Sequence, residues 1–417
     1  MAFAGDPIDP STAVVLVISG GEVVYRNPDV TPVEDDPPAV VDLSLPDRLP
    51  RRYVLKTGRL LGPEGTLAPG ALLVADGGIE ASGATIEAEG APPIFDVGDA
   101  VISPGLLTAH STLGQARAVA ESAGADAGFL RTVDAFDPTG RTVRSLVRGG
   151  VLRAAFAPAP TNVIGGAVGM LRLGAKEPVV EPVAGMNLVL SSSSRSLERF
   201  PVSLPGQIAL IRQFLGLQEE NDPNPRRLLD YYLTAPAINR LDTVRRQRAD
   251  LLRNGQCAAF VEVDDAAEVA SALDLAEELG MCVALVGPGA IEDQADRIAR
   301  LASEGPGILL VLRPLAFGPE ASRRLSRVVD AVEAGAQVLF AAEDAEELRL
   351  LAASAVAAGL PRSEALRALT ASGPNMSKDA KGSWQSGTPA DFVIWDGSPL
   401  DLSSRPLTVV VDGQKLP

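Results

Sequence analysis

The second half of the chain repeats one pattern that determines its fold class. From about residue 255 onwards, a short apolar run typical of a buried strand is followed by a longer segment typical of a helix, and this pair occurs four times. Buried strands that alternate with helices indicate parallel βαβ units. Three of the helical segments end at a glycine, the residue expected to cap a helix in a left-handed conformation (Gly280, Gly335 and Gly359). The four apolar runs are CAAFVEV, MCVALV, GILLVL and AQVLFAA.

Three further apolar runs precede this repeat: VISPGLL, VLRAAFAP and MNLVLS. Together with the four repeats, they favour an α/β protein built on a (β/α)8 barrel of the TIM type. No GxGxxG motif follows a strand with an acidic residue about 20 positions further on, which argues against a dinucleotide-binding sheet. Because a (β/α)8 barrel carries its chemistry at the carboxyl ends of its strands, functional residues are expected there.

Both ends of the chain contain short β-type runs broken by glycine turns, such as YVLKTGRLL near the start and LTVVVDGQKL at the end. This pattern predicts a composite β domain formed by residues 51–100 plus 383–417, around a barrel formed by residues 101–382. Residues 1–50 are rich in Pro, Asp and Val and are expected to form an N-terminal extension. A helical stretch at about residues 191–254 interrupts the barrel pattern and is expected to be an insertion over one end.

Charge and composition argue against several partners. Lys and Arg number 37 and Asp and Glu 53, so the net charge is 37 − 53 = −16, which argues against nucleic acid and anionic membranes as partners. No apolar run reaches the roughly 18 residues that a transmembrane helix needs. Asp6 and Asp9 make the N-terminus a poor secretory signal. Cys257 and Cys282 lie in apolar runs and are expected to be reduced thiols, so we expect a cytoplasmic protein.

The stretch VISPGLLTAHSTLG, residues 101–114, carries the single histidine of the chain, His110. It resembles the first barrel strand of the amidohydrolase superfamily, which reads roughly PGliDaHtHlG. The segment ADFVIWDGSPLD is similar to that superfamily's ADlvvwdgdPl, and TNVIGG is similar to a segment of its imidazolonepropionase-like branch. The resemblance covers roughly residues 53–415 and implies the barrel of a metal-dependent hydrolase, with a small β-sandwich of N- and C-terminal strands. Thr108 stands where the family has Asp, and Thr112 where it has its second metal-binding His.

The resemblance also implies where a metal would bind, and most of those positions lack a ligand side chain. A catalytic zinc needs about three ligands of nitrogen, sulfur or carboxylate type and an open position. Thr, Arg and Gly supply no such ligand, so we expect a degenerate site with no metal and no other cofactor. The implied positions are His110, Thr112, Arg172, Glu262, Gly287 and Asp344.

Two alternatives would preserve charge at the barrel mouth. A divalent metal, zinc or magnesium, could still bind. Glu262, Asp264 and Asp344 could build an oxygen-rich site suited to magnesium or calcium. The competing interpretation, which we favour, is that Asp264 and Asp265 begin the helix that follows them, and that Glu343 and Asp344 do the same for theirs. In the second alternative, Arg172 occupies the position of the lost cation and pairs with Glu262 or Asp344.

His110 has three interpretations. It is a metal ligand without companions, a general base that Glu262 or Asp344 could approach, or a hydrogen-bonded histidine at a strand end. We favour the third. A serine hydrolase is not supported, because neither Ser103-Pro104-Gly105 nor the SSSSRS run forms a GxSxG motif.

Intact scaffold motifs beside missing ligands predict a pseudoenzyme. In the first hypothesis the protein is a non-catalytic structural or regulatory subunit that forms a homo-oligomer or a complex with an active amidohydrolase relative. The alternative is a hydrolase of non-peptide C–N bonds in cyclic amides, with His110, Glu262 and Asp344 as candidate catalytic residues of a rebuilt acidic or metal-free site. A third hypothesis, a small-molecule binding protein, requires an open, polar-lined cavity.

Overall fold

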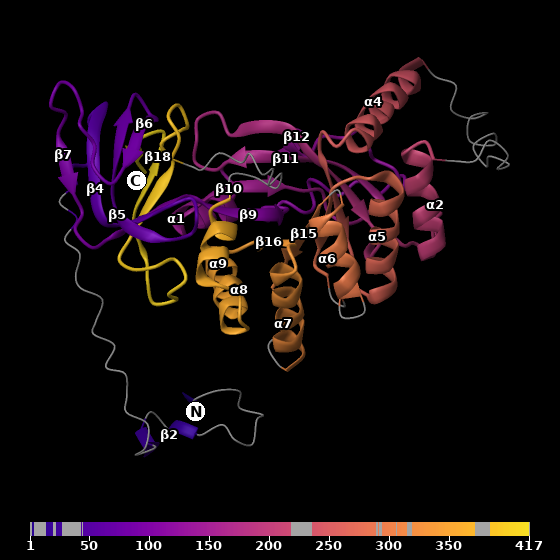
Figure 1. The fold of residues 1–417 in the computed structure, drawn as a ribbon. Coiled ribbons are helices and arrows are strands. Elements are labelled where there is room, and N and C mark those ends of the chain that lie inside the picture. Colours follow the sequence, from indigo (N-terminus) through magenta and orange to yellow (C-terminus); the bar gives the residue numbers. More distant parts are fainter. Residues whose placement is uncertain are drawn as a thin grey trace.

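The computed structural model shows a mixed α/β protein with two eight-stranded sheets and a small three-stranded one (Figure 1). The small antiparallel sheet consists of β1 (Ala2–Phe3), β2 (Val14–Ser19) and β3 (Glu22–Arg26). The structure describes residues 2–3, 14–19, 22–26, 43, 45–217, 236–288, 291, 294–305, 307–314, 319–371 and 384–416.

One eight-stranded sheet forms the predicted barrel, in the order β16-β15-β14-β13-β12-β11-β10-β9. The first and last strands of this order contact each other. The Thr108 hydroxyl lies 2.8 Å from the Ala342 carbonyl oxygen and 3.1 Å from the Ala342 amide nitrogen, so one side chain joins β9 to the residues that follow β16. The strands are β9 (Leu106–Ser111), β10 (Val151–Phe156), β11 (Ile164–Arg172), β12 (Val179–Val189), β13 (Ala258–Glu262), β14 (Val283–Val286), β15 (Ile308–Leu312) and β16 (Gln337–Phe340).

The strand β11 runs against the other seven, because it pairs antiparallel with both β10 and β12. The remaining strand pairs of the barrel are parallel. The sequence pattern did not predict this strand. Its glycines weaken the β signal, and Gly166 has a φ of 109°, a conformation that other residues rarely adopt.

Helices cover the outer face of the barrel, and α5 to α9 stand side by side along it (Figure 1). The predicted caps are present: Gly280, Gly335 and Gly359 all have positive φ. Asp265 forms a capping box with Glu268 at the start of α5. The helices are α1 (Arg141–Arg148), α5 (Ala266–Leu279), α6 (Ala295–Ser303), α7 (Pro319–Glu333), α8 (Ala345–Ala357) and α9 (Arg362–Leu369).

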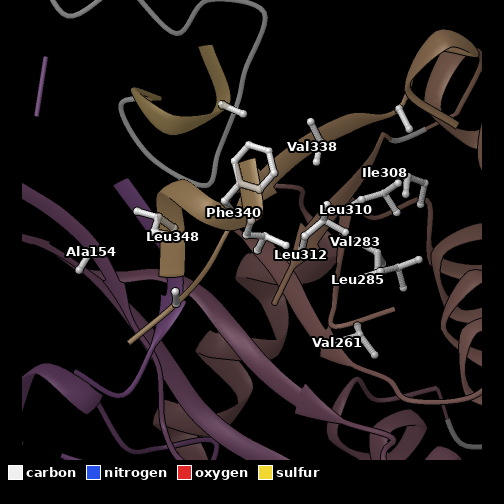
Figure 2. Packing of buried hydrophobic residues seen from close by; sticks show 14 of the residues in the cluster. Ala154, Val261, Val283, Leu285, Ile308, Leu310, Leu312, Val338, Phe340 and Leu348 are labelled. Atoms are coloured by element: carbon white, nitrogen blue, oxygen red, sulfur yellow. The ribbon is translucent and has the colours of Figure 1, made fainter. Parts of the chain in front are cut away.

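Side chains of the barrel strands alternate between two cores. The outward set, which includes Leu285, Leu310 and Phe340, packs with the helices in the main hydrophobic cluster (Figure 2). The inward set, which includes Phe260 and Val311, fills the barrel and is rich in alanine. This alternation, with a period of two residues, determines which polar side chains at the strand ends face the barrel axis.

The stretch predicted as an insertion contains η2 (Ser192–Ser194), α2 (Leu204–Phe214) and α4 (Pro236–Arg253), and part of it lies outside the described residues. Ile211 and Phe214 of α2 and Ala249 and Leu252 of α4 are buried in the main core. These helices therefore pack on the barrel in the chain's passage from β12 to β13.

The second eight-stranded sheet takes its strands from both ends of the chain. Arg172, at the end of β11, forms ion pairs with Asp391 and Asp412. Each aspartate is next in sequence to a strand of this sheet, so Arg172 connects the sheet to the barrel. Its strands are β4 (Arg52–Leu61), β5 (Leu67–Ala75), β6 (Gly78–Gly83), β7 (Ile94–Asp96), β8 (Val101–Pro104), β17 (Phe392–Trp395), β18 (Pro406–Val411) and β19 (Gln414–Lys415). Within the described part of the chain, no helix combines the length and apolar character needed to cross a bilayer.

Candidate functional site

Polar side chains follow the inward-facing apolar residues at the carboxyl ends of several barrel strands. On β13, Glu262 is two residues beyond the inward Phe260, and after β15, Arg313 is two residues beyond the inward Val311. On β12, Asn187 is buried between outward neighbours. Because strand side chains alternate with a period of two, all three side chains point to the barrel axis.

These three side chains meet His110 of β9 in a closed ring of hydrogen bonds, which we call the mouth ring (His110, Asn187, Glu262 and Arg313). His110 Nε2 lies 2.9 Å from Asn187 Oδ1, and Asn187 Nδ2 lies 3.1 Å from Glu262 Oε1. Arg313 Nη1 lies 2.8 Å from Glu262 Oε2, and its Nη2 lies 2.8 Å from His110 Nδ1. Four strands far apart in the sequence thus form one polar unit.

Elementary chemistry determines the direction of each hydrogen bond in the mouth ring. A guanidinium has only donors, so Nδ1 of His110 must accept from Arg313. The ring proton of His110 is then on Nε2, which donates to the Asn187 carbonyl oxygen. The amide nitrogen of Asn187 donates in turn to Glu262, whose carboxylate accepts from both sides.

The surroundings of His110 favour its neutral form. Burial, and after it the positive charge of Arg313, lower the pKa of His110 to about 4 against the opposing effects of Glu262 and Asn187. The imidazole also lies against Phe260, with ring centroids 5.6 Å apart. Only Arg313 reaches water, with 38% of its side chain exposed, compared with 3% for Glu262.

Glu343 organises the backbone next to the mouth ring. Its carboxylate accepts hydrogen bonds from the amides of Thr112 and Gly114, both at 2.7 Å, and from the Thr112 hydroxyl at 3.0 Å. Glu343 therefore fixes the loop that follows β9. Thr112 does not take part in the mouth ring, although it is two residues from His110.

The structure brings together two of the predicted candidates, His110 and Glu262, with Nε2 and Oε1 3.8 Å apart. Asp344 instead caps α8, where its carboxylate accepts from the amides of Glu346 and Glu347. Asp264 is exposed, and its neighbour Asp265 caps α5. Asp265 and Asp344 therefore begin the two helices as expected, whereas Glu343, which was expected to do the same, binds the loop after β9 instead.

The alternative in which Arg172 pairs with Glu262 or Asp344 is wrong. Because β11 is antiparallel, its last residue lies at the opposite end of the barrel, where Arg172 makes two hydrogen bonds of 2.7 Å with Asp391. Arg313 makes the contact with Glu262 that was assigned to Arg172. Gly287 lies beside it, since a Cβ at that glycine would be 3.6 Å from Arg313 Cδ.

Sequence reasoning missed Asn187 and Arg313. The signal was present, because both continue the inward alternation of a strand whose apolar run was recognised. A period of two along MNLVLS places the amide of Asn187 on the inner face. The same period along GILLVL, extended by one residue, places the guanidinium of Arg313 there. Neither residue stands at a ligand position that the family resemblance implies.

Comparison with known proteins supports the fold. No protein-family model matches the chain, and no curated protein is significantly similar to it in sequence. The solved structure of an amidohydrolase from Thermotoga maritima MSB8 matches with a TM-score of 0.70 at 19% identity, over 87% of this chain and 99% of that one. The chain has the amidohydrolase fold.

Two further solved structures match less closely. One is an amidohydrolase, with a TM-score of 0.52 and 15% identity over 88% of this chain and 98% of that one. The other is a prolidase complexed with N-methylphosphonate-L-proline, with a TM-score of 0.51 and 13% identity over 88% of this chain and 99% of that one. These similarities concern the fold alone.

The amidohydrolase fold implies a divalent metal at the barrel mouth, and the donors of the mouth ring do not fit one. Both ring nitrogens of His110 are engaged, and Nδ1, the one with a lone pair, accepts from a cation. Arg313 also lies against the Glu262 carboxylate, so a second cation there would be repelled. Among the described residues, no group of three His, Cys, Asp or Glu side chains could hold a metal ion.

Proposed function

We propose that this protein is a non-catalytic homologue of the amidohydrolases that serves as a structural or regulatory subunit. The observation that carries the proposal is the closed mouth ring. In this ring the guanidinium of Arg313 pairs with the carboxylate of Glu262 and so takes the place of a bound cation. A buried carboxylate needs a partner of opposite charge, and Arg313 supplies it within the chain.

The mouth ring also lacks a free general base. His110 could take a proton at Nδ1 only after breaking its hydrogen bond with Arg313, and its low pKa opposes protonation near neutral pH. Glu262 already accepts from Asn187 and Arg313. These contacts satisfy the polar groups without leaving a site for water activation.

We infer the subunit role because, in this proposal, the chain keeps the amidohydrolase fold without its hydrolytic activity. We propose that the protein assembles with copies of itself or with an active amidohydrolase relative. Light scattering of the purified chain, alone and mixed with such a relative, measures this directly. A monomer that does not associate with either contradicts the subunit role.

The decisive experiment combines metal analysis with an activity screen. The protein is purified without a polyhistidine tag, dialysed separately against zinc, manganese and magnesium, and analysed by mass spectrometry for bound metal. We expect far less than one equivalent per chain. One or two tightly held equivalents contradict the proposal.

The same preparation is screened for hydrolysis of cyclic amides and dipeptides. We expect no turnover above that of a Glu262→Gln variant, with Asp344→Asn as the matched control because Asp344 only caps a helix. Turnover that Glu262→Gln abolishes and Asp344→Asn retains, with both variants folded, establishes the alternative function, a hydrolase with a rebuilt site. That result overturns the non-catalytic proposal.

A further inference from the structure

A pocket of about 560 Å³ borders the mouth ring. It has no part in the hydrogen bonds of the ring or in the proposed function. Its volume is in the range of small-molecule sites. The apolar part of its wall includes Val119, Phe129, Leu130 and Val244. Gly165 is also part of the wall, and a Cβ there would lie 3.1 Å from Asn187 Nδ2, so the pocket and the mouth ring share a boundary.

Arg248 of α4 lines this pocket and carries an unsatisfied donor. Its Nε atom is buried and has no hydrogen-bond partner within the described part of the chain. A buried donor on a charged group is costly when unpaired, and native structures seldom leave one without a reason. Val244, one helical turn earlier, lines the pocket on the same side of α4.

The other charged groups of the wall already have partners. Arg131 makes hydrogen bonds of 3.0 and 2.6 Å with Asp134. The Glu121 carboxylate accepts from the amides of Ser122 and Ala123. The charge of Arg248 is therefore not balanced by either acid, and burial followed by repulsion from Arg131 lowers the pKa of Arg248.

Another arginine of α4, Arg245, holds in place the helix that carries Arg248. Arg245 pairs with Asp126, in the loop after β9, and with Asp242 on its own helix. The backbone of that loop is bonded to β11, from Ala127 to Ile164 and from Ala167 to Leu130. Arg248 is thus presented from a fixed wall, so a ligand would meet a preorganised positive charge.

We propose that this pocket binds a small organic anion with an apolar body and a carboxylate, which pairs with the guanidinium of Arg248. A guanidinium prefers planar oxygen acids, and the apolar wall excludes water from the rest of the ligand. The proposal does not depend on whether the mouth ring is catalytic.

The test is isothermal titration of the full chain with hexanoate and benzoate, and with their neutral amides, hexanamide and benzamide. We expect the acids to bind and the amides to bind at least about tenfold more weakly, because a charge-assisted hydrogen bond is lost. Inorganic phosphate, which has charge but no apolar body, is expected to bind more weakly than either acid.

Arg248→Gln is expected to remove the preference for acids over amides while leaving the thermal unfolding midpoint nearly unchanged. Arg246→Gln is the matched control, since Arg246 is exposed on the same helix and does not line this pocket. Three results overturn the proposal: no binding of either acid at millimolar concentration, equal binding of acids and amides, or an unchanged preference in Arg248→Gln.

Discussion

Arg313 donates a hydrogen bond to His110, with Nη2 2.8 Å from Nδ1, although the two residues are 203 positions apart in the chain. The same guanidinium pairs with Glu262 at 2.8 Å. One side chain therefore satisfies the lone pair of the histidine and the charge of the carboxylate. Each of these two contacts leads to a prediction.

His110 is expected to stay neutral, with its proton on Nε2, down to about pH 5, because burial and Arg313 lower its pKa to about 4. It is the only histidine in the chain, so its NMR signals are assigned without ambiguity in a protein purified without a polyhistidine tag. Nitrogen shifts should show an unprotonated Nδ1 and a protonated Nε2. Protonation near pH 6.5, or the opposite tautomer, would show that the mouth ring is not formed in solution.

The low pKa of His110 also makes stability depend on pH. Between pH 6.5 and about 4, the unfolded chain holds a proton on this residue that the folded chain lacks. The contribution is therefore fully present above pH 6.5 and is lost as pH falls towards 4, by on the order of 3 kcal/mol. Urea unfolding at several pH values measures the slope, and His110→Gln should have a shallower slope in this window.

Arg313→Gln is expected to lower the free energy of unfolding by about 2–4 kcal/mol, because it leaves the buried carboxylate of Glu262 without its cation. Adding Glu262→Gln to that variant should recover part of the loss, since the buried charge is removed. Arg327→Gln is the control, because Arg327 and Asp330 form an exposed pair, 53% exposed on both sides. Equal effects of Arg313→Gln and Arg327→Gln would refute the role given to Arg313.

Thr108→Val is expected to cost about 1–3 kcal/mol, although valine has nearly the same shape, because both polar groups of the Ala342 backbone lose the hydroxyl. Thr108→Ser retains the hydroxyl and should cost less. Thermal unfolding of the two variants decides the point. If valine is tolerated as well as serine, this hydroxyl does not help to close the barrel.

Arg172 offers a comparison within one cluster. Its partner Asp391 is 2% exposed, whereas Asp412 is 48% exposed. Asp391→Asn should therefore lower the free energy of unfolding by about 2–4 kcal/mol and Asp412→Asn by less than about 1 kcal/mol. Chemical unfolding of both variants measures the difference, and similar losses would contradict the burial argument.

The sequence by itself determined the class of fold, because strand and helix periodicity are local. The four repeats, the glycine caps and the acidic helix starts at Asp265 and Asp344 depend on residues within a few positions of each other. The β-rich ends likewise predicted a sheet built from both termini. A local pattern of this kind can be read without knowing the neighbours in space.

Only the tertiary structure decided which side chains meet His110. Periodicity places Asn187, Glu262 and Arg313 on inner faces, but it does not say that they converge, because their strands are brought together by closure of the barrel. It also gave no direction for β11, and so Arg172 was placed at the wrong end. The fold follows from local pattern, whereas the mouth ring depends on long-range contacts that no local pattern encodes.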